Sequence, residues 1–204
     1  MPRLVCARMR IVMVMVVRDE ADIIGENLAF HLSRGVDLAI VADHGSNDAT
    51  AETLCRHAAA GRVRRIEAEG RFDPGRWMNE MARLAVEEEG ADWVLPNDAD
   101  EFFFPREGTL AEILARAPEG VGALACRRHN FVPTADEAEP WFERMTRRRR
   151  VSLNARGRPL PGKVVHRAHP GLAIKMGNHR RVGPEVGATV QSEEIEVLQF
   201  QMRT

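Results

Sequence analysis

Short apolar runs alternate with amphipathic segments over the first hundred residues of the chain. Four of the runs are typical of strands: RIVMVMVV, VDLAIVAD, RVRRIEAE and ADWVLPND. The segments between them place apolar side chains at helical spacing, as Ile23, Ile24, Leu28 and Leu32 do, and each ends near a glycine. Strands that alternate with helices in this way form parallel βαβ units, so we expect an open α/β sheet flanked by helices.

The pattern changes after TLAEILARAP, a predicted short helix that begins at Thr109. The runs GVGALACRRHNFV, GKVVHRA, GLAIKM, ATVQS and EIEVLQFQM predict short strands separated by Gly and Pro turns. Residues 133–150 (PTADEAEPWFERMTRRRR) have no clear period and predict a long loop, of the kind that serves as a lid or binding segment. We expect one domain over residues 1–204, with an α/β half (1–115) and a β-rich half (116–204).

The composition narrows the classes of protein to consider. Hydrophobic residues make up 44% of the chain and the net charge is -1, so no global attraction to nucleic acid is implied. No apolar stretch approaches the roughly 20 residues of a membrane helix, and no small-residue cleavage site follows the apolar run 11–17. Cys6, Cys55 and Cys126 are too widely spaced to indicate a disulfide framework or a zinc site. We expect a cytoplasmic protein with no transmembrane segment and no nucleic-acid partner.

Polar segments follow three of the predicted strands. RDEAD follows the first strand, DHGSND the second and NDADEF the fourth. In an open α/β sheet, ligands bind beyond the carboxyl ends of the parallel strands. We therefore expect the three segments to face one crevice.

The third polar segment gathers Asp98, Asp100 and Glu101 within four positions. Carboxylates this close repel one another, so a chain keeps them together chiefly when a cation lies between them. Residues two apart on an extended segment point the same way, so Asp98 and Asp100 can reach one ion. Oxygen ligands favour a hard divalent ion, Mn²⁺ or Mg²⁺. The alternative interpretation is an acidic turn whose side chains are simply solvated.

Four segments, in order, resemble the family 2 type of glycosyltransferases with the GT-A fold, and more closely the subgroup with a DADEF element. They are RDEADIIGENLAFHLSRGVD, VADHGSNDATAETL, GRWMNEMARLA and DWVLPNDADEFFFP, and the resemblance covers residues 11 to about 115. It implies a GT-A-like (nucleotide-diphospho-sugar transferase) fold. It also implies a metal-dependent, hexosyltransferase-like enzyme that moves a sugar from a nucleoside-diphosphate sugar to an acceptor.

The same resemblance implies roles for individual residues. The donor would be bound by Arg18, Asp19, Glu20, Asp43, Arg76, Asn79 and Lys163, with Asp43 at the base or ribose. Asp98 and Asp100 would hold Mn²⁺ or Mg²⁺, with His179 as a third ligand. Gln199 or Gln201 stands where relatives place a histidine, a departure that removes a possible metal ligand.

Transfer to a hydroxyl acceptor also needs a base within hydrogen-bond reach of that hydroxyl. Glu101, adjacent to the metal motif, is the first candidate. His129, His166 and the acids of residues 136–143 are alternatives, and Trp141 is a candidate for stacking on a sugar.

Two other classes of function fit parts of the pattern. A nucleotidyltransferase or phosphohydrolase would use the same carboxylates and the same ion. A non-catalytic protein could use the arginines at 147–150 to bind polyanions. For a glycosyltransferase, the acceptor could be a sugar, a lipid or a protein.

Overall fold

The computed structural model describes residues 9–133, 140–154, 156–175, 177, 181–182 and 187–201, with the backbone alone at 181–182. The elements are β1 (Ile11–Val17), α1 (Ile24–Ser33), β2 (Leu38–Asp43), α2 (Thr50–Ala59), β3 (Val63–Glu67), α3 (Pro74–Glu87), β4 (Trp93–Asn97), β5 (Glu101–Pro105), α4 (Leu110–Ala115), β6 (Val121–Asn130), α5 (Trp141–Arg144), β7 (Lys163–Arg167), β8 (Ala173–Ile174), β9 (Arg181–Val182) and β10 (Ala188–Gln199). Within the described ranges, no helix has both the length and the apolar character that crossing a membrane requires.

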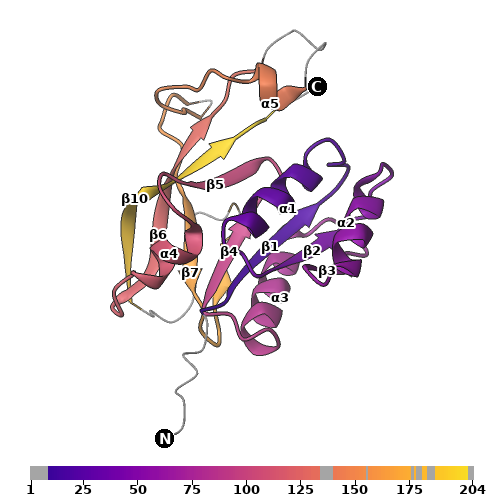
Figure 1. Ribbon diagram of the computed structural model, residues 1–204, viewed down its shortest axis with the longest axis horizontal. Coiled ribbons are helices and arrows are strands. Elements are labelled where there is room, and N and C mark those ends of the chain that lie inside the picture. Colours follow the sequence, from indigo (N-terminus) through magenta and orange to yellow (C-terminus); the bar gives the residue numbers. More distant parts are fainter. Residues whose placement is uncertain are drawn as a thin grey trace, which may run out of the picture.

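One mixed sheet organises the chain, with the strand order β3-β2-β1-β4-β7-β6-β10-β5. The strands β3, β2, β1 and β4 run parallel to one another, as the alternation of apolar runs and helices predicted. β7 is antiparallel to both β4 and β6, while β10 is parallel to β6 and antiparallel to β5. The prediction of an open, mainly parallel α/β sheet with a β-rich second half is confirmed (Figure 1).

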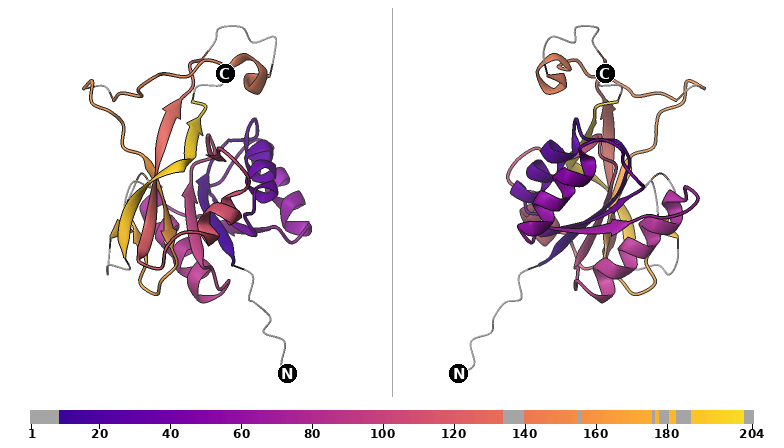
Figure 2. Two further views of the ribbon diagram at one scale, coloured as in Figure 1. Left: turned by 60° about the vertical axis from the view of Figure 1, so that its left-hand side comes forward. Right: turned by 90° about the vertical axis from the view of Figure 1, so that its right-hand side faces the viewer.

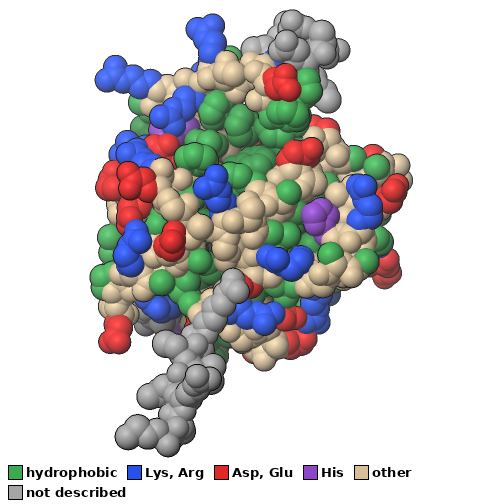
Figure 3. Space-filling model, viewed as in Figure 1, with side chains coloured by type: hydrophobic (Ala, Val, Ile, Leu, Met, Phe, Trp, Pro, Cys, Tyr) green, Lys and Arg blue, Asp and Glu red, His purple; other side chains and the backbone are tan. Residues whose placement is uncertain are grey.

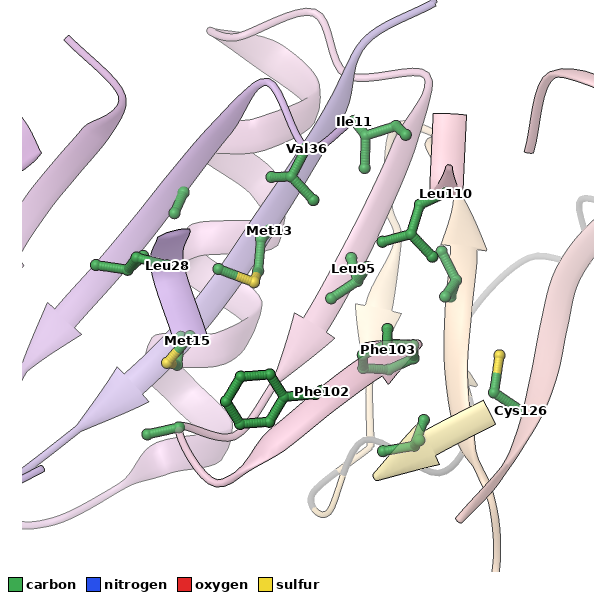
Figure 4. Close-up of a cluster of buried hydrophobic side chains, with 14 of the residues drawn as sticks. Ile11, Met13, Met15, Leu28, Val36, Leu95, Phe102, Phe103, Leu110 and Cys126 are labelled. Carbon is green, nitrogen blue, oxygen red and sulfur yellow. The ribbon is translucent and has the colours of Figure 1, made fainter. Parts of the chain in front are cut away.

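The two faces of the sheet are covered by different helices. Ile11, Met13 and Met15 of β1 pack in one apolar cluster with α1, α2 and α4 (Figure 4). Val12 and Val14, which point the other way, pack in a second cluster with α3. Figure 2 shows these helices on the two sides of the strands. Because both faces of β1 are buried, its sequence is continuously apolar rather than alternating.

Several predictions for the strands after β4 were wrong in detail. ATVQS and EIEVLQFQM are not two strands: they form one long β10, whose pairing with β6 shifts between Ser192 and Glu196. β5 was not predicted, because its three phenylalanines suggested packing rather than a strand. GLAIKM contributes only the two residues of β8.

The predicted loop at 133–150 contains the short helix α5, and residues 134–139 lie outside the described chain. Trp141 of α5 is buried and packs against Phe102 and Phe200. Its indole N–H donates to the carbonyl oxygen of Asp22 at 3.0 Å. The prediction that Trp141 stacks on a sugar was therefore wrong for this arrangement, because its ring surface is used in packing.

A buried polar network ties α1 to the segment that joins β4 and β5. The Asn27 amide donates to the carbonyl oxygens of Ala99 and Glu101 at 2.9 and 2.8 Å. The ring of His31 lies between the Asn27 carbonyl oxygen, 2.8 Å from Nδ1, and the Phe103 N–H, which donates to Nε2 at 3.1 Å. Nε2 can accept that bond only when it carries no proton, so His31 is neutral with its proton on Nδ1.

The pH dependence of stability should report this network. Burial lowers the pKa of His31 from 6.5 to about 4, and the hydrogen bond to Asn27 offsets only part of the effect. The unfolded chain recovers the ordinary value and binds the extra proton, so the free energy of unfolding should fall as the pH drops from 6.5 towards 4. The slope from this one group approaches about 1.4 kcal/mol per pH unit. Urea denaturation across this range should show a shallower dependence of the free energy of unfolding on pH for His31→Gln than for the native chain. Equal slopes for the native chain and His31→Gln would contradict the assignment.

Candidate active site

A cavity of about 350 Å³ opens at the carboxyl ends of β1 and β4. Three sources supply its walls: the strand ends, the start of α3 and the segment after β8. The residues that line it include Val16, Arg18, Glu20, Phe72, Pro74, Met78, Asp98, Ile174 and Lys175. We call it the Asp98 cavity. It lies where an open α/β sheet binds its ligands.

The polar segments after β1 and β2 are interlocked beside this cavity. The Asp19 N–H donates to Ser46 Oγ at 3.0 Å, and Asp19 Oδ1 accepts from the Asn47 N–H at 2.7 Å. The Glu20 N–H donates to Thr50 Oγ1 at 2.8 Å. Asp19 has a φ of 53°, an uncommon backbone conformation that these bonds hold. The structure thus brings the first two predicted segments together at one edge of the sheet.

Asp43, at the end of β2, lines a second cavity of about 520 Å³. This Asp43 cavity shares Arg18 with the Asp98 cavity, so the two adjoin. The Asp43 carboxylate is almost fully buried and accepts from the backbone N–H and the hydroxyl of Ser46 at 3.0 and 2.7 Å. Its other oxygen lies 3.1 Å from the Arg65 guanidinium. These partners hold Asp43 rigidly at the cavity edge.

A buried lysine lies against the acidic cluster. Lys163 Nζ is 2.6 Å from Asp98 Oδ2 and 3.0 Å from Glu101 Oε2, and Arg128 Nη1 is 3.4 Å from Glu101 Oε1. The Lys163 and Glu101 side chains are 2% and 0% exposed, whereas that of Asp98 is 45% exposed and lines the cavity. Burial, followed by the charge of Asp98, raises the pKa of Glu101 to about 7, although Lys163 opposes this shift. Lys163 therefore offsets negative charge of Asp98 and Glu101 from the protein interior, while the Asp98 side chain faces the cavity.

Asp100 points toward the end of β10. The Gln199 amide donates to Asp100 Oδ2 at 3.1 Å, and the Phe200 N–H donates to the Asp100 carbonyl oxygen. Gln199, one of the two glutamines noted at the place of a histidine in relatives, is thus in contact with Asp100, a predicted metal ligand. Gln201, the other glutamine, has a different partner: its side-chain oxygen accepts a hydrogen bond from the Asn130 amide at 3.2 Å.

The donor chemistry of this corner fits a hard divalent ion. Asp98 and Asp100 supply carboxylate oxygens from one short turn, and oxygen ligands suit Mn²⁺ or Mg²⁺. Within the described residues, no group of three His, Cys, Asp or Glu side chains could hold a metal. His179, the predicted third ligand, lies outside the described residues.

Arg76 and Asn79, both on α3, do not line the Asp98 cavity. Arg76 lines a neighbouring depression with residues 69–73, and its N–H donates to the capping Asp73. The Asn79 amide group donates to the carbonyl oxygens of Gly75 and Ile174 at 2.8 and 3.1 Å, and its oxygen accepts from the Ile174 N–H at 2.7 Å. Asn79 therefore holds the wall of the cavity in place, instead of reaching into it.

The sequence did not predict two of the residues that line this site. Lys175 follows β8 and brings a cation to the Asp98 cavity, while Phe72 precedes α3 and is 58% exposed at its rim. The rings of His44 and Trp77 lie 5.2 and 6.0 Å from that of Phe72. Both residues lie in loops, where no periodic pattern could have indicated which way they point.

Comparison with solved structures gives similar folds at low sequence identity. TarS from S. aureus, residues 1-349 in complex with UDP, matches with a TM-score of 0.51 and 16% identity over 78% of this chain and 47% of that one. GalNAc-T7 with UDP, GalNAc and Mn²⁺ matches with a TM-score of 0.58 and 14% identity over 95% of this chain and 44% of that one. The fold is GT-A-like.

A third structure of this fold is glucosyl-3-phosphoglycerate synthase from Mycobacterium tuberculosis, in complex with Mn²⁺, UDP and phosphoglyceric acid. It matches with a TM-score of 0.50 and 17% identity over 91% of this chain and 68% of that one. The chain therefore spans less than half the length of TarS 1-349 and GalNAc-T7, and about two thirds of the synthase. No family model matches the sequence, and no curated protein matches it.

Replacing Asn79 should loosen the wall of the Asp98 cavity without unfolding the chain. In Asn79→Ala, the N–H and the carbonyl group of Ile174 lose their hydrogen bonds to the Asn79 side chain. This should lower the free energy of local opening at Ile174 by about 1 kcal/mol. Hydrogen exchange of the Ile174 amide should accelerate by about fivefold, because the local opening that exposes it becomes easier by that amount. Glu80→Ala, an exposed change on the same helix, is the control and should leave this rate unchanged. An unchanged rate in Asn79→Ala would contradict the role assigned to Asn79.

Proposed function

We propose that the chain is a metal-dependent glycosyltransferase, which moves a sugar from a nucleoside-diphosphate sugar to an acceptor. The observation that carries the proposal is the Asp98 cavity: a partly exposed carboxylate, two cations from Arg18 and Lys175, and a position at the carboxyl ends of the parallel strands. The GT-A-like fold supports it, since the three similar structures carry UDP. The DADEF element adds the resemblance to one subgroup of family 2 glycosyltransferases.

The donor would span the two adjoining cavities. In this proposal the diphosphate lies between Arg18 and Lys175, and the nucleoside lies toward Asp43. Asp19 and Glu20 lie in the loop after β1, beside the cavities, and their bonds to Ser46 and Thr50 hold this loop in place. Phe72 offers an exposed ring at the rim against which a base or a sugar can pack. Arg76 adjoins this rim, and Asn79 acts through the wall that it holds.

The metal would be held by Asp98 and Asp100, with His179 as the proposed third ligand. When bound, Mn²⁺ or Mg²⁺ supplies Lewis-acid stabilisation of the negative charge that develops on the departing diphosphate. Gln199 would keep Asp100 in place through its hydrogen bond. Two of the similar structures were determined with Mn²⁺, which is consistent with this assignment.

For Lys163 and Glu101 we propose roles that differ from the predicted ones, which were donor binding for Lys163 and the catalytic base for Glu101. Lys163 is buried beneath Asp98, so we propose that it orients this carboxylate and adds positive potential to the cavity floor. Glu101 was the first candidate for the base, but its side chain is fully buried between Lys163 and Arg128. We propose that Glu101 holds these two cations in place.

A donor-hydrolysis assay tests the reaction class. A panel of nucleoside-diphosphate sugars is incubated with Mn²⁺, and the release of free sugar and nucleoside diphosphate is measured. Slow release of sugar supports a glycosyltransferase. Consumption of a nucleoside triphosphate with release of pyrophosphate would instead indicate a nucleotidyltransferase.

Replacing Asp98 should remove the metal-dependent part of nucleotide binding. We expect Asp98→Asn to weaken binding of UDP or GDP in the presence of Mn²⁺ by about tenfold or more, because one anionic ligand is lost; tenfold corresponds to about 1.4 kcal/mol. Asp92→Asn is the matched control, since Asp92 precedes the same strand at its other end and accepts from the Arg10 N–H. Titration calorimetry with and without Mn²⁺ measures the effect. Equal affinities for the native chain and Asp98→Asn, with Mn²⁺ present, would disprove the assignment.

A further inference from the structure

A third cavity, of about 300 Å³, lies over the end of β6. Residues 150–152 and 159–160 form one wall, and the polar residues and the glycine that line the cavity include Arg127, Arg128, His129, Arg150, Ser152 and Gly162. None of the described residues that line it is acidic. We call it the arginine cavity. In Figure 3, Lys and Arg side chains gather at the upper left, near the ends of β6 and β10 in the matching view of Figure 1.

The arginine cavity lies on the same face of the sheet as α3 and the Asp98 cavity. Val94 of β4 packs with α3, and it is opposite His166 of β7. Val164, two residues before His166, is opposite Ala125 of β6, so these side chains share one face. Arg127 and His129 lie two and four positions beyond Ala125 and therefore point to this face as well.

The two cavities are also close along β7. Gly162 lines the arginine cavity, and Lys163, the next residue, contacts Asp98, which lines the other cavity. A ligand in the arginine cavity would therefore be two strands away from the donor, at the same edge of the sheet.

Positive charge in the arginine cavity is not balanced by the described chain. Glu196, which is opposite Arg127 in the pairing of β6 with β10, already lies between Arg106 at 2.6 Å and Arg148 at 2.9 Å, with His129 at 3.4 Å. Neither Arg127 nor Arg150 pairs with a carboxylate of the described residues. Arginines gathered without a counter-charge favour an anionic ligand.

Arg128 alternates with Arg127 and His129 along β6, so its side chain points to the opposite face of the sheet, toward Glu101. Its side chain is only 8% exposed, and its guanidinium reaches Glu101 at the long distance of 3.4 Å. Its buried Nε has no hydrogen-bond acceptor among the described residues. Arg128 therefore supports the acidic cluster, and the case for a ligand in the arginine cavity rests on Arg127 and Arg150.

The wall of the arginine cavity is held by hydrogen bonds. Ser152 Oγ accepts from the Asn130 N–H at 2.9 Å, and the Arg149 N–H donates to the Asn130 carbonyl oxygen at 2.9 Å. The Leu160 N–H donates to the Ser152 carbonyl oxygen at 2.8 Å. These bonds fix the segment against β6, so the cavity exists before any ligand enters it.

We propose that the arginine cavity binds an oxyanion, a phosphate or a carboxylate, carried by the acceptor. This rests on the proposed glycosyltransferase function, and it narrows the acceptor to an anionic molecule whose hydroxyl extends toward Asp98. Guanidinium groups bind both oxyanions through paired hydrogen bonds, so the chemistry is shared. Arg127 and Arg150 are the binding residues, and His129 lines the same cavity.

The test is titration calorimetry with inorganic phosphate and, separately, with lactate as a carboxylate probe. We expect binding of at least one of them, weakened about tenfold or more by Arg127→Gln and by Arg150→Gln, because each change removes a charge-assisted hydrogen bond. Arg156→Gln, an exposed change in the same segment, should leave the affinity unchanged. Arg18→Gln shows how much of the phosphate binding belongs to the proposed donor site. The probe that binds more tightly identifies the anionic group.

Binding of neither probe, or binding lost only in Arg18→Gln, would overturn the proposal. UDP affinity with Mn²⁺ is measured on the same proteins and should be unchanged in Arg127→Gln and Arg150→Gln. If UDP binds and neither oxyanion does, the acceptor site alone fails. If an oxyanion binds at the arginines and no nucleotide binds, the proposed function fails and the acceptor assignment fails with it.

Discussion

The site depends on the ion pairs that a buried lysine makes with the acidic cluster. Asp98, Asp100 and Glu101 lie within four positions, and their mutual repulsion would open the turn between β4 and β5. Lys163 Nζ lies within 3.0 Å of two of these carboxylates, and Arg128 supports Glu101 from the other side. Because Lys163 and Glu101 are both withdrawn from water, each needs the other, and this requirement joins β5 and β7 at one place.

Neutral hydrogen bonds complete the support of the same turn. Asn27 of α1 binds the carbonyl oxygens of Ala99 and Glu101, and His31, one helical turn later, accepts from the Phe103 N–H. Asp100 is held from the opposite side by Gln199 at the end of β10. The turn that carries Asp98 is therefore fastened to a helix and to strands far from it in sequence. Such fastening keeps a charged group in position before a ligand arrives, which is what electrostatic stabilisation of a reaction requires.

The strand order places a second cavity at this edge of the sheet. β7 runs antiparallel to β4 and β6, so its first residue, Lys163, lies at the edge where β4 and β6 end. The Asp98 cavity and the arginine cavity are therefore at the same edge and on the same face, one rich in mixed charge and the other in positive charge. Two cavities with one strand, β7, between them would suit the proposed reaction, which joins two substrates, and the start of β7 with Lys163 lies between them.

The sequence by itself determined the local elements and much of the chemistry at the strand ends. The alternation of apolar runs and helical spacing predicted β1 to β4 and the helices between them, because periodicity follows directly from which faces are buried. The spacing of Asp98 and Asp100 predicted a cation at the carboxyl ends of the parallel strands, and this stays a prediction. Only the tertiary structure decided that Lys163, 65 positions away from Asp98, is its partner, that Asn79 holds a wall, and that Glu101 is enclosed. The physical reason is that these contacts depend on strand order and register, which bring distant segments together and leave no periodic trace in the chain.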